Sequence, residues 1–332
     1  MRAMVSTLVA WSLVAIAPTT TPAAIPAPAP AAAQREGATS AGALRDRFIG
    51  TWKLVDSEQR NSRGEVVPPA AGTAERTGYL IYDPAGYMAV SIMPVGRKKY
   101  AALQPSDAEA QAALNGYAGY FGTFTIDAAS NVITHHTQGS VTPGMATDQK
   151  RGFEFNGGRL TLKPPVGANG NQSRLTWERL PDLVNPSDEQ RRFFGFWKLI
   201  SSERRNMRGD LLGANPGQTG YIIYTSAGFM MVHMVRPGRK PFAASQPTGA
   251  KARAAISTYT NYFGPFYVHQ PDGYLVHDQV GYLNIGRNGY SPFQRFYSFE
   301  GRRLLLHPPV SDTPDGQTVQ GTITWERVEP VR

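Results

Sequence analysis

The sequence GTWKLV at Gly50–Val55 decides the fold, because it returns as GFWKLI at Gly195–Ile200. Each copy opens a segment of similar length, and each segment ends on the same four residues, TWER, at Thr176–Arg179 and at Thr324–Arg327. Self-similarity at a nearly constant offset is the sequence sign of a repeated structural unit. The chain of 332 residues is therefore predicted to contain two copies of one domain.

Short apolar runs between these markers predict β-strands. In the first copy Gly78–Tyr82 and Tyr87–Met93 are strand-like, and Asp83–Gly86 between them supplies the Pro and Gly of a hairpin turn. Asn156–Gly158 predicts a tighter turn of the same kind. Counting such runs yields roughly eight strands per copy, which is typical of a sandwich or an up-and-down barrel.

One helix interrupts the strands of each copy. Ser106 and Glu109 have the spacing of a capping box, which predicts a helix over Ala108–Tyr117. In the second copy Thr248 is the matching cap and Lys251–Tyr259 the matching helix, although the glutamate is missing there. We expect these to be short helices in an otherwise all-β chain.

The N-terminus is predicted to be a secretory signal peptide. Arg2 supplies the positive charge at its start, and Ala3–Ala17 is an apolar run too short to span a bilayer comfortably. Ala31–Ala33 fits the small-residue A-x-A pattern of a signal-peptide cleavage site. A retained membrane anchor is the alternative, and the cleavage position stays open. The expected organisation is a signal peptide at 1–33, a flexible lead-in at 34–46, domains at 47–180 and 192–328, and a linker at 181–191.

Composition limits the classes of partner. The chain has no cysteine, so core packing rather than disulfides must hold the domains, and no cysteine is present to carry a lipid anchor. The formal net charge is +9, with small basic groups that could contact an anionic surface weakly or could simply be solvated turns and strand edges. Nucleic acid is not an expected partner, because no RNA or DNA motif accompanies this charge. We expect a periplasmic or secreted protein.

A Gly-x-Trp start paired with a late arginine resembles the lipocalin barrel. Trp52 with Arg179, and Trp197 with Arg327, fit this pattern, and the ordered set of runs is similar to the bacterial and fungal lipocalin-like domain family over about 47–180 and again 192–328. The resemblance implies that the tryptophan closes one barrel end while the guanidinium packs over its ring. The expected fold is therefore all-β, with two tandem antiparallel lipocalin-like β-barrels, each with one short helix.

The resemblance implies little about activity, because the family's activity is poorly defined. This chain also departs from secreted lipocalins, which usually carry a disulfide and place their helix after the barrel. The ligand of a typical lipocalin is therefore not transferred to this protein.

Motifs for nucleophilic catalysis and phosphate binding are missing, and no cofactor is expected. His135 and His136 are adjacent on a predicted strand, so their side chains point to opposite faces and cannot chelate one metal ion together. We accordingly expect no metal site, and we favour a binding function over catalysis.

An acid/base pair inside each barrel is one hypothesis for a reactive site. Glu58 follows Trp52 by an even number of residues, so both face inward unless a bulge intervenes. Glu58 with His135 could then form a proton-transfer pair in the first barrel, and Glu203 with His277 in the second. The alternative is that Glu58 lies at the rim with Arg60 or Lys99, and that His135 is a hydrogen-bonded structural residue.

Aromatic and methionine side chains supply the candidate ligand pocket. They could line a soft, adaptable cavity or simply fill the core. The candidate ligand-binding residues are Tyr79, Met88, Tyr117, Tyr120, Phe121, Tyr221, Met230, Tyr259, Tyr262 and Phe263.

Three functions are compatible with these patterns. The first is an exported binding protein that holds a small apolar or amphiphilic molecule in one or both barrels. The second is a cofactor-free isomerase, cyclase or hydrolase that uses the inward Glu and His. The third is a structural module whose basic surface meets the cell envelope.

Overall fold

The computed structural model describes residues 42–69, 73–145, 147–243, 247–286, 289–313 and 316–331. The predicted signal peptide at 1–33 and most of the lead-in at 34–46 lie outside these ranges. Residues 42–48 are helical, so the end of the expected lead-in is structured. Helix α3 (Asp188–Phe193) likewise occupies the end of the expected linker at 181–191. No helix among the described residues is long and apolar enough to cross a membrane.

The first half of the chain forms a closed antiparallel barrel. Strand β1 pairs with β3 on one side and with β9 on the other, which closes a ring of eight strands, while the short β2 pairs with the end of β1 outside the ring. The elements are β1 (Gly50–Arg60), β2 (Val66–Val67), β3 (Arg76–Tyr82), β4 (Tyr87–Pro94), α2 (Asp107–Leu114), β5 (Ala118–Asp127), β6 (Val132–Ser140), β7 (Asp148–Asn156), β8 (Arg159–Lys163) and β9 (Gln172–Arg179).

The second half repeats this barrel. Strand β10 pairs with β12 and with β20, and the ring again contains eight strands. The elements are β10 (Gly195–Asn206), β11 (Leu211–Ala214), β12 (Thr219–Tyr224), β13 (Phe229–Val235), α4 (Gly249–Ser257), β14 (Tyr259–His269), η1 (Gln270–Asp272), β15 (Tyr274–His277), β16 (Gly281–Tyr282), β17 (Phe293–Glu300), β18 (Arg303–His307), β19 (Ser311–Asp312) and β20 (Thr318–Arg327). The predicted all-β fold of two tandem antiparallel barrels is confirmed.

A tryptophan lies in the closed end of each barrel. The Trp52 indole N–H donates to the Phe48 carbonyl and the Trp197 N–H to the Phe193 carbonyl, both at 2.7 Å, and neither ring is more than 2% exposed. The Arg327 guanidinium carbon lies 4.2 Å from the centre of the Trp197 ring. Arg179 is the cross-strand neighbour of Trp52 in the first barrel.

A β-bulge in the first strand of each barrel changes which side chains face inward. The register of β1 against β9 shifts between Leu54 and Asp56, leaving Val55 exposed. Leu54 still pairs with the buried Trp177, but beyond the bulge the inward positions become odd-numbered. Ser57 and Gln59 therefore face the interior. The same shift occurs in β10 between Leu199 and Ser201.

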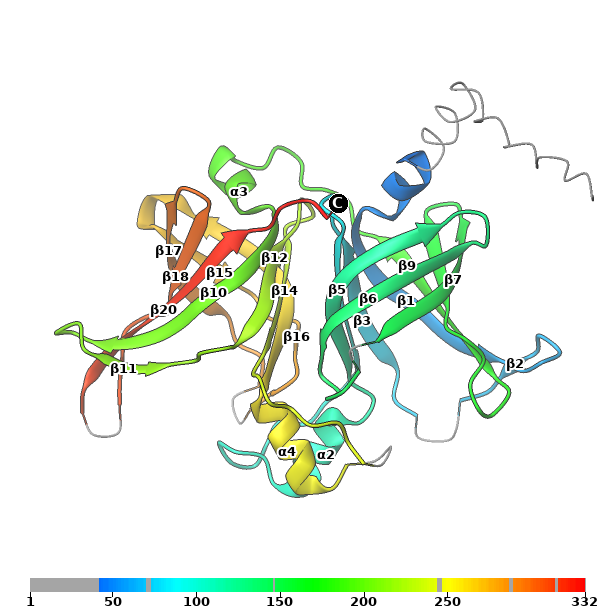
Figure 1. The fold of residues 1–332 in the computed structure, drawn as a ribbon, viewed down its shortest axis with the longest axis horizontal. Coiled ribbons are helices and arrows are strands. Elements are labelled where there is room, and N and C mark those ends of the chain that lie inside the picture. The colour runs from blue at the N-terminus through cyan, green and yellow to red at the C-terminus, as the bar shows by residue number, and fades with distance from the viewer. Residues whose placement is uncertain are drawn as a thin grey trace, which may run out of the picture. The chain divides into compact units, whose positions relative to one another are not determined.

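The outer faces of the two barrels pack on one another through a shared apolar cluster. Ala89 and Phe121 from the first barrel join Met231 and Phe263 from the second in this cluster. Helices α2 and α4 lie side by side at the same interface, as Figure 1 shows. An ion pair between Arg253 and Asp107 at 2.6 Å connects the two helices.

Two matching arginines hold this interface reciprocally. Arg97 of the first barrel donates to the carbonyls of Tyr282 and Leu283 in the second. Arg239 of the second donates to the carbonyls of Ser140 and Val141 in the first. Each also reaches the end of its own barrel's helix, and each lies 5.2 Å from a tyrosine ring centre. The arrangement is that of an approximately two-fold, self-complementary interface.

Candidate functional site

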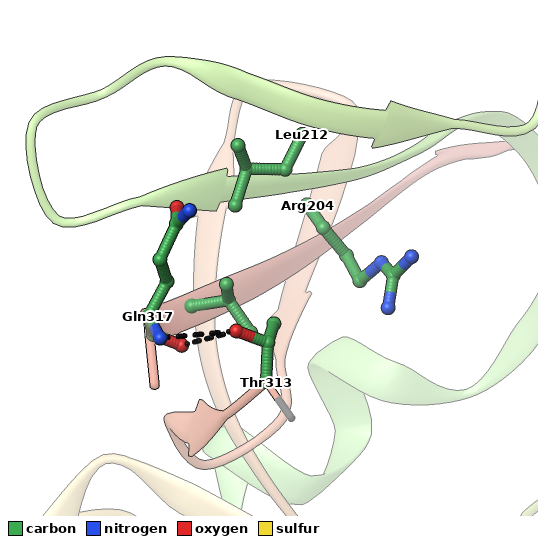
Figure 2. A pocket seen from close by; sticks show the side chains of 5 residues that line it. Arg204, Leu212, Thr313 and Gln317 are labelled. Atoms are coloured by element: carbon green, nitrogen blue, oxygen red, sulfur yellow. Dashed lines mark hydrogen bonds between the residues drawn. The ribbon is translucent and has the colours of Figure 1, made fainter. Parts of the chain in front are cut away.

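A shallow hollow of about 240 Å³ lies beside the second barrel, where the short strands β11 and β19 pair with the ends of β10 and β20 (Figure 2). Apolar side chains of Leu212 and Val319 line it beside Arg204 and Gln317. Beyond the bulge in β10 the inward positions are even-numbered, so Arg204 faces inward, as Ser202 does. This hollow therefore combines apolar and cationic groups.

Deeper inside the first barrel, a histidine is held between two tyrosines. The Tyr82 hydroxyl lies 2.7 Å from Nε2 of His135, and the Tyr120 hydroxyl lies 2.8 Å from Nδ1. Strands β3, β6 and β5 supply these residues, and His135 is only 1% exposed. A neutral imidazole offers one donor and one acceptor, so each tyrosine satisfies one ring nitrogen.

The second barrel repeats this Tyr–His–Tyr group. The Tyr224 hydroxyl lies 2.8 Å from Nε2 of His277, and the Tyr262 hydroxyl lies 3.1 Å from Nδ1. His277 is fully buried. Because both barrels contain the Tyr–His–Tyr group in the same geometry, the group is a feature of the repeated domain and is not special to one copy.

The electrostatics keep both histidines neutral. Burial, reinforced by the nearby Arg151 charge, lowers the pKa of His135 to about 3. Burial and Arg295 lower the pKa of His277 well below its usual value. Burial also raises the pKa of Tyr82 well above the ordinary phenol value. Neither barrel therefore presents a basic or anionic group from this triad near neutral pH.

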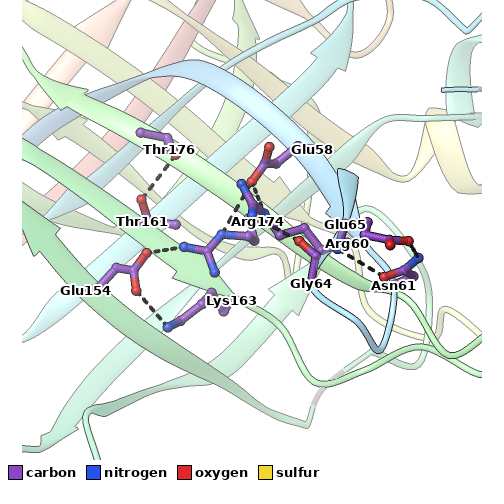
Figure 3. Close-up of polar contacts among 10 residues, drawn as sticks. All are labelled: Glu58, Arg60, Asn61, Gly64, Glu65, Glu154, Thr161, Lys163, Arg174 and Thr176. Carbon is purple, nitrogen blue, oxygen red and sulfur yellow. Dashed lines mark hydrogen bonds and ion pairs between the residues drawn. The ribbon is translucent and has the colours of Figure 1, made fainter. Parts of the chain in front are cut away.

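The acid/base hypothesis fails on geometry, and the bulge is the reason. Glu58 pairs in register with Arg174 on the outer wall, where it lies 2.7 Å from Arg60 and 3.5 Å from Arg174 (Figure 3). Glu203 lies 2.9 Å from Arg205 in the same way. The proposed pairs of Glu58 with His135 and of Glu203 with His277 therefore do not form, and the rim alternative with Arg60 describes the structure.

The inner wall of the first barrel has further polar side chains around the histidine and along β1. Inward alternation places Gln149 and Arg151 on β7 opposite the His135 strand, and Ser57 and Gln59 on β1. Ser57 and Gln59 are exposed although they point inward. The inward positions of β1 near Trp52 are therefore buried, and those toward the other end of the strand are accessible to solvent.

Buried polar atoms without protein partners face into both barrels. Thr137 Oγ1 and Trp177 Nε1 have no hydrogen-bond partner among the described residues, and neither do Gln279 Nε2 and Trp325 Nε1. Thr137 and Gln279 each follow the central histidine by two residues, so these atoms occupy matching inward positions. An unsatisfied buried polar group costs about 1–3 kcal/mol, which a bound polar partner would recover.

The two barrels differ in how much of the interior they fill. In the first barrel Tyr120 pairs with Ser140, and His135 with Gln149. At the matching positions of the second barrel Tyr262 pairs with Tyr282, and His277 with Phe293. Tyr282 and Phe293 contact the Tyr262 ring at centroid distances of 5.8 and 5.4 Å. The first barrel has the smaller side chains around its histidine.

The predicted pocket residues divide into two groups. Four lie inside the barrels: Met88, Tyr120, Met230 and Tyr262. Six instead lie in the cluster between the barrels, which corrects the expectation that they line a cavity: Tyr79, Tyr117, Phe121, Tyr221, Tyr259 and Phe263. Strand alternation explains the division, because Phe121 follows the inward Tyr120 and so points outward.

Sequence reasoning missed the inward polar wall. Thr137 follows from simple alternation once His135 is set inward, and the repeated TWER run marked Trp177 and Trp325 as matching residues. Gln149 is placed inward by its pairing with His135 across two strands, which the sequence does not give. The inward positions of Ser57 and Gln59 could not be found in this way, because they depend on the bulge. His136 lies on the outer face as expected, with Nδ1 2.8 Å from Asp148. No group of described residues could hold a metal ion.

Comparisons with known proteins agree with this architecture at the level of the domain. A family model described as a lipocalin-like domain matches residues 49–180 and 194–328. No curated protein matches the chain.

Solved structures give only remote likenesses. A protein of unknown function from Nostoc punctiforme is 10% identical, with 85% of this chain and 97% of that chain covered and a TM-score of 0.22. A mutant of transferrin binding protein B from Haemophilus parasuis is 8% identical, with 83% and 75% covered and a TM-score of 0.21. Scores of this size support no argument about function.

Proposed function

Since the chain belongs to the family of lipocalin-like domains, we propose that it is a binding protein that holds a small amphiphilic molecule inside its first barrel. The observation that carries this proposal is the inner wall of that barrel. Around Trp52 and Trp177 this wall is packed and apolar, whereas the inward Ser57 and Gln59 farther along β1 are polar and accessible. An amphiphile matches such a wall, because its apolar body can contact the apolar side chains while its polar group meets the polar ones.

The unsatisfied donors support the same occupant. The Thr137 hydroxyl and the Trp177 indole N–H are buried in a wall that otherwise satisfies its polar groups. A ligand that accepts these hydrogen bonds gains specificity, because competitors without an acceptor leave the donors unsatisfied. The second barrel offers matching donors but has Tyr282 and Phe293 around its histidine, so we assign the principal site to the first barrel.

The cellular location remains part of the proposal. The predicted signal peptide at 1–33 supports export to the periplasm or beyond. Contact with an anionic surface stays a prediction. Two of the arginines in the basic groups that suggested this contact form hydrogen bonds within the protein instead. Arg97 and Arg239 hold the barrel interface and are not available as a surface charge.

Native mass spectrometry tests the proposal. Protein purified from its producing cells should show an extra mass under native conditions that disappears on denaturation. Thr137→Val keeps the side-chain volume but removes the inward hydroxyl, and it should lower occupancy by about fivefold, the value of one hydrogen bond.

Thr125→Val is the matched control, because Thr125 lies on β5 and contacts His136 on the outer face. Its occupancy should equal that of the wild type. Identical native and denatured masses for the wild-type protein, even after incubation with an extract of its own cells, would count against any bound small molecule.

A further inference from the structure

Each barrel contains an inward-facing guanidinium beside its Tyr–His–Tyr group. Arg151 on β7 pairs in register with Ile133 on the inner wall, and Arg295 on β17 pairs with the fully buried Leu275. Arg151 lies near Tyr120 and Arg295 near Tyr262, where each positive charge partly offsets the rise that burial causes in the pKa of that phenol. The two arginines therefore occupy the same place in the two barrels.

Neither guanidinium is balanced by a carboxylate. Arg151 donates to neutral acceptors, the Lys150 carbonyl at 2.8 Å and the Gln149 side-chain oxygen at 3.3 Å. Arg295 donates to the Gln294 carbonyl at 2.7 Å and stacks 4.8 Å from the centre of the Phe293 ring. No ion pair involves either arginine among the described residues.

The acids near Arg151 in sequence point the other way. Asp148 lies on the outer face with His136, and Glu154 lies there with Lys163 and Arg174. Glu58 also lies outside, as described above. The Tyr82 and Tyr120 phenols beside Arg151 are not ionised, because burial raises their pKa values, so they supply no countercharge. A cation in a partly enclosed, low-dielectric space without a countercharge favours an anionic partner.

We propose that the molecule held in the first barrel carries an anionic head group, such as a carboxylate, sulfonate or phosphate, which pairs with Arg151. Gln149 orients the guanidinium, and the Trp177 and Thr137 donors are available to the rest of the ligand. This inference rests on the proposed binding function and adds the charge of the ligand to it. In the second barrel Arg295 retains the same preference, but Tyr282 and Phe293 leave less room around it.

Two fluorescent probes that differ by one group test this inference. 8-Anilino-1-naphthalenesulfonate is an anion, and N-phenyl-1-naphthylamine is the same molecule without the sulfonate. The wild-type protein should bind the sulfonate at least about tenfold more tightly, as expected for one charge-assisted hydrogen-bonded pair. Arg151→Gln should remove this advantage while leaving the affinity for the neutral probe unchanged, which also shows that the variant is folded.

Lys150→Gln is the matched control, because Lys150 is the outward neighbour of Arg151 and its substitution makes the same change in net charge. It should leave both affinities unchanged, Arg151→Lys should retain part of the preference, and Arg295→Gln should have the smaller effect. Inorganic phosphate at the same ionic strength as a chloride control should not displace the sulfonate probe, since it has no apolar body.

Four results would overturn the inference. If the wild-type protein bound both probes with equal affinity, and Arg151→Gln changed neither affinity, the pocket would have no preference for an anion. An equal loss in Lys150→Gln would show a general charge effect, and displacement by phosphate would show a bare anion site. Binding of neither probe would remove the proposed function as well, so the two failures are distinguishable.

Discussion

Lowering the pH from 7 to 5 should remove about 6 kcal/mol of folding stability through three buried histidines, at about 2 kcal/mol each. His135, His233 and His277 are at most 1% exposed. Burial lowers the pKa of His135 and of His233 to about 3, and that of His277 well below its usual value. His233 lies at the barrel interface, where Nδ1 is 2.8 Å from the Tyr259 hydroxyl.

The sign follows from the order of protonation. Because the folded pKa values lie below the unfolded value of about 6.5, the unfolded chain takes up protons first as the pH falls. The contribution of each histidine is therefore fully present above about pH 6.5 and is lost as the pH falls toward its folded pKa, which is about 3 for His135 and His233. The slope should approach about 1.4 kcal/mol per pH unit for each histidine.

Urea unfolding at pH 7, 6 and 5 measures this slope. His233→Asn should reduce it by about one third, and His269→Gln, a change of an exposed histidine, should leave it unaltered. A stability that does not change between pH 7 and 5 would mean that these histidines are not buried in neutral form.

Removing either interface arginine should cost about 4 kcal/mol, and the two substitutions should have similar effects. Arg97→Met removes three hydrogen bonds to backbone carbonyls, and Arg239→Met removes the equivalent set plus a bond to Thr258. Hydrogen bonds from a charged donor contribute about 1.5–3 kcal/mol each to stability. The carbonyl groups that lose their donor stay partly buried, which adds to the loss. Methionine keeps most of the apolar stem, so the loss reports on the guanidinium.

Denaturant unfolding of both variants and of Lys98→Met, an exposed neighbour on the same loop, measures this effect. Lys98→Met should remain within about 0.5 kcal/mol of the wild type. A large loss for Arg97→Met with none for Arg239→Met would contradict the reciprocal interface.

The sequence was informative wherever one copy could be compared with the other. Trp52 and Trp197 open the two units, and their indoles are buried in separate closed sheets as the resemblance implied. His135 and His136 point to opposite faces because strand alternation is a local property. These features need no knowledge of the partner strands.

The failures share a physical cause, which is that inward and outward faces cannot be distinguished by hydrophobicity alone. A single extra residue at Val55 reverses the alternation and moves Glu58 outside. Tyr79 and Phe121 belong to an outward apolar face that is buried only because the other barrel covers it. Neither the bulge nor the barrel contact has a distinctive local sequence.

Exchanging the filling residues between the barrels tests the central claim most directly. Ser140→Tyr with Gln149→Phe installs the side chains of the second barrel in the first, and Tyr282→Ser with Phe293→Gln makes the reverse change. We predict that native mass spectrometry will find the bound molecule lost from the first double variant and retained by the second. Retention of the molecule by the filled first barrel, with its loss from the opened second barrel, would contradict the assignment.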